Sequence, residues 1–236
     1  MFKSMRGGGF IYLSGGGDEQ KTEKIDSFFL DNLPKKSILF IPIGKTGDRN
    51  GYRKSSVWLA NKLNNLHKGS VEISLVTDLK NCPDLKKFSA IYIGGGNTYK
   101  LLHIMERDGF LPVLRNYIRN GGVVYGASAG AVLMGVDIST YIEEKYLPDN
   151  EKHDYKLTDG MALIGKYSIL THFEEGDRQK AEKYFRRKTD PIIAIPSGTA
   201  VMVTRKTAKV IGTGCVCIFH KGRASKKILP NHSFAL

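Results

Sequence analysis

A serine between small residues stands in the stretch 126–130, a G-x-S-x-G sequence centred on Ser128 that follows the apolar run 123–125 and precedes a helical pattern. A sharp strand-to-helix turn at this point lifts the serine oxygen clear of the sheet, and small neighbours let the backbone close that tightly. The pattern predicts acyl transfer, with Ser128 as nucleophile and the backbone N–H of Ala129 as a donor to the oxyanion. The alternative is a close-packed turn without chemistry.

A second glycine-rich segment, 94–98, follows the apolar run 90–93 and precedes another helical pattern. Ligand sites in open α/β sheets lie at the carboxyl ends of strands. We therefore expect Gly95 to supply the second oxyanion donor, and we expect Gly96, Asn97 and Thr98 to bind substrate. A turn followed by a helix N-cap at Asn97 or Thr98 is an alternative that can hold at the same time.

A serine nucleophile needs a general base, and the sequence offers six histidines. His172 closes the apolar run 167–171, so it is expected at a strand end, where catalytic residues of such sheets collect. It is therefore the predicted base. The others fall in helical segments, in the C-terminal tail or, for the rival candidate, in a charged loop: His67, His103, His220, His232 and His153.

The elements that must position these groups alternate between apolar β-rich runs and helical patterns, which predicts a mostly parallel sheet. Strands are expected at 10–13, 38–43, 71–76, 90–93 and 123–125, and helices at 19–33, 52–66, 99–106 and from 110 to 120. Short strands at 192–195, 200–204 and 210–219 read as antiparallel additions to the sheet edge. The predicted fold class is α/β, a doubly wound sheet flanked by helices with antiparallel C-terminal strands, in a single domain spanning 1–236.

Composition limits the classes of function. The net charge is +13, but the basic residues form short dispersed pairs without interleaved aromatics, so we expect no nucleic-acid partner. No stretch approaches the roughly 18 apolar residues that cross a bilayer, so we expect no membrane partner. Cys215 and Cys217 share a strand face, but no second pair completes a metal site, and we expect structural burial. With no export signal in the first ten residues, a cytoplasmic location is expected.

Taken together, the motifs resemble the peptidase E family of serine peptidases, which also includes cyanophycinase. The resemblance runs in element order from about Phe10 to Val203. Its motifs are 91–98 with Leu101 and Leu102, then 126–131, then 171–173. It implies a class I glutamine-amidotransferase-like fold, with serine in place of that fold's usual cysteine. It also implies hydrolysis of short peptides, typically after an N-terminal aspartate, without metal or cofactor.

By position, the resemblance makes Ser128 the nucleophile and His172 the base. Glu143 stands at the family's spacing for the triad acid and is the predicted orienting group. The cyanophycinase-like branch places a glutamate just after the later strand, where this chain has Ser197, which cannot replace a carboxylate. The resemblance also implies that Arg178, in the segment after the histidine, recognises the substrate's aspartate carboxylate; that segment is shorter in this chain.

The partner expected from these residues is a small peptide, acted on by a monomer or homodimer. Two other classes stay open at this point. One is a serine hydrolase that acts on another amide or on an ester, and the other is a non-catalytic ligand-binding domain on the same scaffold.

Overall fold

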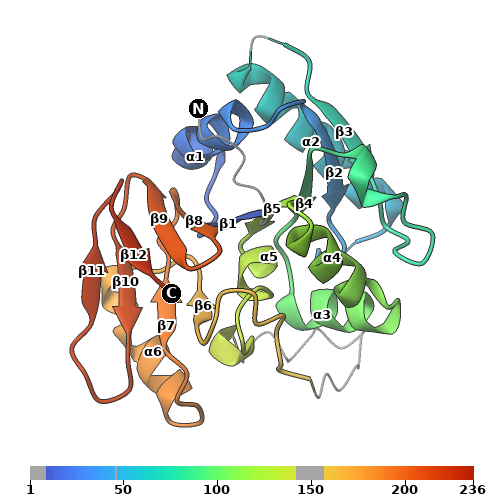
Figure 1. Ribbon diagram of the computed structural model, residues 1–236. Coiled ribbons are helices and arrows are strands. Elements are labelled where there is room, and N and C mark those ends of the chain that lie inside the picture. The colour runs from blue at the N-terminus through green and yellow to red at the C-terminus, as the bar shows by residue number, and fades with distance from the viewer. Residues whose placement is uncertain (1–8, 46, 68, 142–156) are drawn as a thin grey trace.

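The computed structural model describes residues 9–45, 47–67, 69–141 and 157–236 (Figure 1). Its main sheet has eight strands in the order β12-β9-β8-β1-β5-β4-β2-β3. The five strands from β1 to β3 in that order pair in parallel. They are β1 (Phe10–Ser14), β5 (Val123–Ala127), β4 (Ala90–Ile93), β2 (Ser37–Ile41) and β3 (Glu72–Leu75). The other three continue the sheet antiparallel beyond β1: β8 (Thr199–Thr204), β9 (Thr207–Gly212) and β12 (Ser233–Ala235).

Helices cover both faces of the parallel part, as the predicted doubly wound fold requires. In Figure 1, one group lies above the sheet and the other below it. The upper group is α1 (Glu19–Asp31) and α2 (Arg49–Leu66), and the lower is α3 (Thr98–Arg107), α4 (Phe110–Arg119) and the short α5 (Ala129–Val132). A 3-10 turn, η1 (Leu85–Lys87), precedes β4. The predicted fold class is confirmed.

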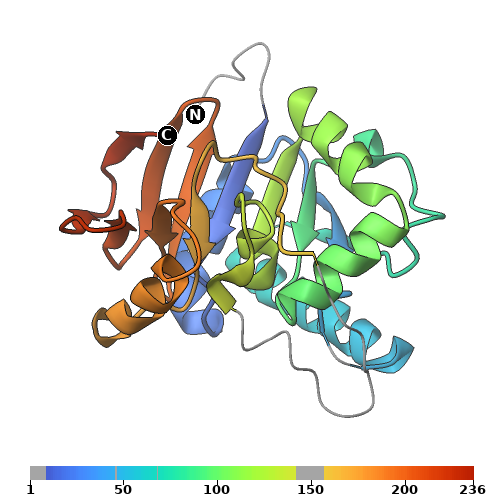
Figure 2. The ribbon, with the colours of Figure 1, turned by 90° about the horizontal axis from the view of Figure 1, so that it is seen from below.

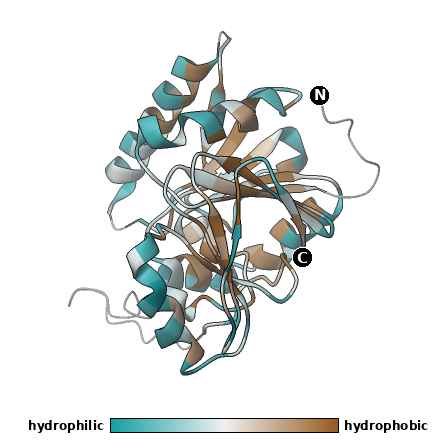
Figure 3. Ribbon diagram, turned by 90° about the vertical axis from the view of Figure 1, so that its left-hand side faces the viewer, coloured by the Kyte–Doolittle hydropathy of each residue, from teal (hydrophilic) through white to brown (hydrophobic). Residues whose placement is uncertain are grey.

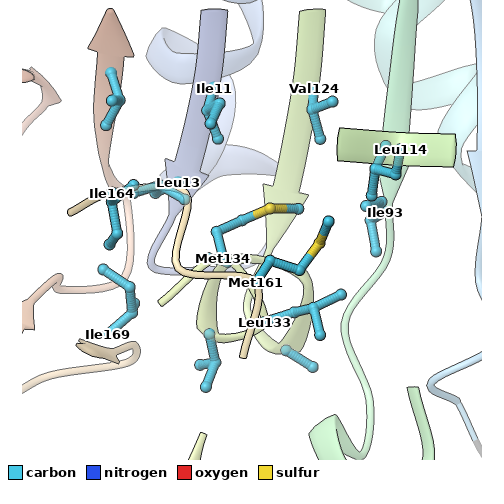
Figure 4. Packing of buried hydrophobic residues seen from close by; sticks show 14 of the residues in the cluster. Ile11, Leu13, Ile93, Leu114, Val124, Leu133, Met134, Met161, Ile164 and Ile169 are labelled. Carbon is cyan, nitrogen blue, oxygen red and sulfur yellow. The ribbon is translucent and has the colours of Figure 1, made fainter. Parts of the chain in front are cut away.

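Period-two alternation along the strands builds two cores from one sheet. In β1, Ile11 and Leu13 point into the core on the α3 and α4 side, whereas Tyr12 packs toward α1 and α2. The same alternation recurs in β2, β4 and β5. Figure 4 shows side chains from β1, β4 and β5 meeting those of α4 and of Leu133 and Met134, which follow α5. The helices turn hydrophilic surfaces outward while the strands between them are hydrophobic (Figure 3).

A second sheet of four strands stands beside the main one, in the order β11-β10-β7-β6. Its members are β6 (Ser168–Leu170), β7 (Ile192–Ala194), β10 (Val216–Phe219) and β11 (Lys226–Ile228). The turn η3 (Glu175–Asp177) and helix α6 (Arg178–Phe185) connect β6 to β7, which pair in parallel. These C-terminal elements lie together on one side of β1 in both ribbon views (Figures 1 and 2).

The prediction of a single strand over 210–219 is wrong, because this stretch contains the end of β9 and the whole of β10, which lie in different sheets. Gly212 has φ +104°, and a Cβ there would lie 2.3 Å from the Gly198 carbonyl oxygen. The chain turns at this point, so β9 ends in the main sheet and β10 begins in the second. Only β8, β9 and β12 are additions to the main sheet, whereas β7 and β10 belong to the other.

A buried ion pair ties α1 to α2 above the sheet. Nζ of Lys62 lies 2.6 Å from Oδ2 of Asp26, and both side chains are nearly inaccessible. The other carboxylate oxygen of Asp26 accepts a hydrogen bond of 2.9 Å from the Tyr125 hydroxyl. Tyr125 stacks on Tyr92 with ring centroids 4.4 Å apart. Burial, followed by the Asp26 charge, raises the pKa of Tyr125 well above its usual value.

Removing one partner of this pair should be costly, because the other charge stays buried. We expect Asp26→Asn to lower the free energy of unfolding by ~3–5 kcal/mol, measured by urea denaturation. Asp31→Asn, at the exposed last residue of the same helix, is the control and should change stability little. A loss of under ~1 kcal/mol for Asp26→Asn would show that the pair contributes only as much as a surface ion pair.

Candidate active site

Ser128 occupies a strained turn between β5 and α5. Its backbone has φ 51° and ψ −110°, a region that non-glycine residues rarely adopt. The turn closes tightly because Gly126 and Gly130 approach each other, and a Cβ on Gly126 would lie 2.5 Å from the Gly130 carbonyl oxygen. The Ser128 N–H donates to the Ser14 carbonyl at 3.0 Å, which fixes the turn to the end of β1. Such strain costs ~1–3 kcal/mol and clusters at functional sites.

His172 is brought to Ser128 from the second sheet. It comes just after β6, and its Nε2 lies 2.7 Å from Oγ of Ser128. Its backbone N–H donates to the Gly15 carbonyl at 3.0 Å, so the loop after β1 holds the end of β6. Across this Oγ–Nε2 contact a hydroxyl proton can pass to an imidazole. The structure thus joins the two residues that the sequence singled out as nucleophile and base.

The triple glycine 15–17 forms the floor beneath the imidazole, a role that the sequence analysis missed. A Cβ on Gly16 would lie 2.2 Å from Cε1 of His172, and Gly16 has φ +85°. A Cβ on Gly15 would lie 2.1 Å from the Pro196 carbonyl oxygen. Both positions therefore need glycine. The available signal was their place at the carboxyl end of a central strand, where site loops gather.

The other ring nitrogen of His172 faces a hydroxyl. Nδ1 lies 3.2 Å from Oγ of Ser197, in the turn that follows β7. Ser197 is the residue that the sequence analysis set aside because it carries no charge. Glu143, the expected triad acid, lies outside the described residues.

The environment of the imidazole works against its protonation. His172 is accessible as a residue, yet its ring lies against Gly16, Ser128 and Ser197. This partial burial lowers the pKa of His172 from its usual value, and the positive charge of Lys180 lowers it further. Lys180 lies on α6 and forms a half-exposed ion pair with Asp177 at 3.1 Å. The neutral ring is thus favoured at neutral pH.

Two backbone segments flank the Ser128 side chain. A Cβ on Gly95 would lie 3.2 Å from Cβ and 3.7 Å from Oγ of Ser128, so the backbone there approaches the serine closely. On the other side, Ala129 is the first residue of α5. The amides of Ala131 and Val132 donate back to the Ser128 carbonyl at 2.8 and 3.0 Å. Gly95 therefore lies close to the Ser128 side chain, and Ala129 follows Ser128 directly in the chain; the oxyanion role of their amides stays a prediction.

The three residues after Gly95 have structural tasks. A Cβ on Gly96, which has φ +129°, would lie 2.2 Å from the Gly44 carbonyl. Asn97 is the N-cap of α3, and its side chain accepts a hydrogen bond of 2.9 Å from the Lys100 N–H. Thr98 is fully buried. The N-cap alternative therefore holds at Asn97, and substrate binding by Gly96, Asn97 and Thr98 stays a prediction.

Arg178 opens α6 on the exposed side of the second sheet. Its guanidinium donates to Oγ of Ser225, in the hairpin between β10 and β11, at 3.3 Å. Within the same region, Lys227 pairs with Glu175 at 2.5 Å. Substrate recognition by Arg178 also stays a prediction, and Lys180 is a second cation that acts on the site electrostatically.

Histidines, cysteines and acidic residues are spread over the part of the chain that the structure describes. No three histidine, cysteine or acidic side chains gather there as a metal-ion site would require. Cys82, Cys215 and Cys217 are free thiols. No helix within the described ranges combines the length and apolar character of a membrane span.

Comparison with known proteins gives a family match over most of the chain. A model of peptidase family S51 matches residues 10–211. Peptidase E of Pasteurella multocida (strain Pm70) is 26% identical over 216 residues, which are 87% of this chain and 88% of that protein. Peptidase E of Haemophilus influenzae (strain PittGG) is 24% identical over 201 residues, 81% of each protein.

Two solved structures share the fold. A peptidase from an acI-B1 Actinobacterium superposes with a TM-score of 0.71 and 17% identity, covering 100% of both chains. A peptidase E protein described as putative, from Listeria monocytogenes EGD-e, gives a TM-score of 0.66 and 22% identity, over 88% of this chain and 100% of that one.

Filling the space at Gly16 should displace the imidazole from Ser128. We expect Gly16→Ala to lower the rate of covalent labelling by a fluorophosphonate probe about 100-fold, because misplacing a reacting group by ~1 Å can cost that much. Gly109→Ala is a matched control, since Gly109 also has a positive φ, +68°, but open space around it. Equal labelling rates in the two variants would show that the position of the His172 ring does not depend on glycine at position 16.

Proposed function

The chain belongs to peptidase family S51, and on that basis we propose that it is a serine peptidase of short peptides, with Ser128 as nucleophile and His172 as general base. The observation that carries the proposal is the 2.7 Å contact between Oγ of Ser128 and Nε2 of His172, made at a strained strand-to-helix turn. A neutral imidazole at this distance can accept the hydroxyl proton.

In the proposed first step, His172 takes the proton of Ser128 as the serine oxygen attacks the scissile carbonyl carbon. The carbonyl oxygen becomes an oxyanion, which the amides of Gly95 and Ala129 stabilise. The tetrahedral intermediate then collapses, and protonated His172 gives its proton to the leaving amine. The carbon–nitrogen bond breaks, and the acyl group stays on Ser128.

In the second step, water replaces the amine. His172 takes a proton from that water, the resulting oxygen attacks the acyl carbon, and the same amides hold the second oxyanion. The imidazolium returns its proton to Ser128 as the acid product leaves. His172 carries every proton transfer in this scheme, so we propose hydrolysis without a metal or cofactor.

For the substrate, we propose short peptides with an N-terminal aspartate, bound by a monomer or homodimer. Several relatives are named Peptidase E, and the resemblance implies that preference. The chain's charge of +13 favours acidic ligands. Lys180 contributes positive potential at His172, and Arg178 offers a guanidinium that can bind a carboxylate with two parallel hydrogen bonds. The free thiols are consistent with a reducing, cytoplasmic location.

Ser128→Ala should abolish the reaction. We expect turnover of a dipeptide library to fall by up to ~10⁶, the scale on which a triad serine acts in a well-studied protease. The stability should change little, because only one hydroxyl is lost. Ser74→Ala, which removes a half-buried hydroxyl from β3, is the matched control. Full activity of pure Ser128→Ala would reject the nucleophile, whereas an active wild type that cleaves only esters or other amides would change the substrate class.

The aspartate preference can be measured by competition between Asp-X and Asn-X dipeptides. Because Arg178 is exposed, an ion pair between its guanidinium and the aspartate carboxylate is worth up to ~1 kcal/mol, which is up to about 5-fold in kcat/KM. We expect Arg178→Met to remove most of that preference without slowing fluorophosphonate labelling. Arg186→Met, at the exposed C-cap of α6, is the control. Equal wild-type rates on the two dipeptides would remove both the preference and the role of Arg178.

A further inference from the structure

The imidazole of His172 is held on its far side by a second serine. For Nε2 to accept the Ser128 proton, the ring hydrogen of the neutral form has to be on Nδ1, and Nδ1 lies 3.2 Å from Oγ of Ser197. Building on the proposed function, we propose that Ser197 is the positioning residue of the site. Its hydroxyl accepts the Nδ1 hydrogen and so fixes the tautomer and ring orientation, at the place where a triad has a carboxylate.

The Ser197 hydroxyl stands on a rigid support. It lies in the β-turn 196–199, which is closed by a hydrogen bond of 3.2 Å from the Thr199 N–H and has Gly198 at φ +75°. The Gly198 N–H in turn donates to the Gly16 carbonyl at 2.8 Å. The turn and the floor of the imidazole are therefore one bonded unit. A hydrogen bond from such a support orients a ring more precisely than one from a mobile side chain.

A hydroxyl differs from a carboxylate in charge. It accepts the Nδ1 hydrogen, but it cannot neutralise the imidazolium that forms when His172 takes the serine proton. The charged group that acts on the ring from α6 is Lys180, and it is also positive. Because neither the Ser197 hydroxyl nor Lys180 favours the imidazolium, the base should stay neutral, and competent, to lower pH than a carboxylate-paired histidine.

The rival for this position is Glu143. Neutral imidazole carries a single hydrogen on Nδ1, so its main acceptor is either Ser197 or a carboxylate. The two assignments predict opposite results for single substitutions. Ser197→Ala and Glu143→Gln therefore form the decisive pair.

We expect Ser197→Ala to lower kcat about 2- to 13-fold, the net effect of losing one neutral hydrogen bond, with KM little changed. Ser197→Thr keeps the hydroxyl and should retain most of the activity. Ser197→Asp adds a charge beside the ring, which raises the pKa of His172 and moves the acidic limb of the pH–rate profile to higher pH. Ser89→Ala, a half-buried serine that precedes β4, is the control and should match wild type.

Nuclear magnetic resonance of the His172 ring tests the same contact without peptidase activity. Ser197→Ala should shift the Nδ1 resonance, and titration should show the raised pKa in Ser197→Asp. Unchanged ring resonances and kcat in Ser197→Ala, with a loss of up to ~10⁴ in Glu143→Gln, would overturn the proposal and assign the role to Glu143. A wild type that neither cleaves peptides nor reacts with fluorophosphonate would reject the proposed function, while the ring resonances would still decide the Ser197 contact.

Discussion

The site depends on backbone hydrogen bonds that join two sheets at their carboxyl edges. The carbonyls of Gly15 and Gly16, just beyond β1, accept the N–H groups of His172 and Gly198, which follow β6 and β7. These bonds hold the ends of β6 and β7 next to the end of β1, which is itself paired with β5. The 2.7 Å contact between Oγ of Ser128 and Nε2 of His172 depends on this line of backbone hydrogen bonds, which we call the seam. Glycine is required along it because side chains there would collide with the imidazole and with the turn after β7.

Backbone strain is concentrated at Ser128 and His172. Ser128 has φ 51° and His172 has φ 49°, so the two residues whose side chains meet both have left-handed backbones. Neither could hold that conformation alone, because each costs ~1–3 kcal/mol. The buried cores on both faces of the main sheet supply the rigidity, and the Asp26–Lys62 pair locks the helices that cover one of them. The fold thus stabilises a local geometry that its own residues disfavour.

Local signals account for what could be predicted from the sequence. The five parallel strands were expected from their apolar runs, and Ser128 and His172 from small neighbours and from a strand end. The assignment of β7 and β10 to a second sheet was not predictable, because it depends on a break at Gly212 that is set by contact with Gly198. The nearness of Ser197 to Nδ1 likewise arises from long-range packing. Its lack of charge had removed it from consideration, although a hydroxyl can also accept a hydrogen bond.

The position of β1 between two strands that come later in the chain limits the order in which the main sheet can assemble. β1 precedes both of its neighbours in the chain, which are β5 on one side and β8, residues 199–204, on the other. During translation, the β8-facing edge of β1 stays unpaired until residues 199–204 have left the ribosome. The loop that supports His172 is fixed only when that edge closes. In a nascent chain, Ser128 therefore leaves the ribosome long before His172 and the loop that supports it reach their positions in the fold.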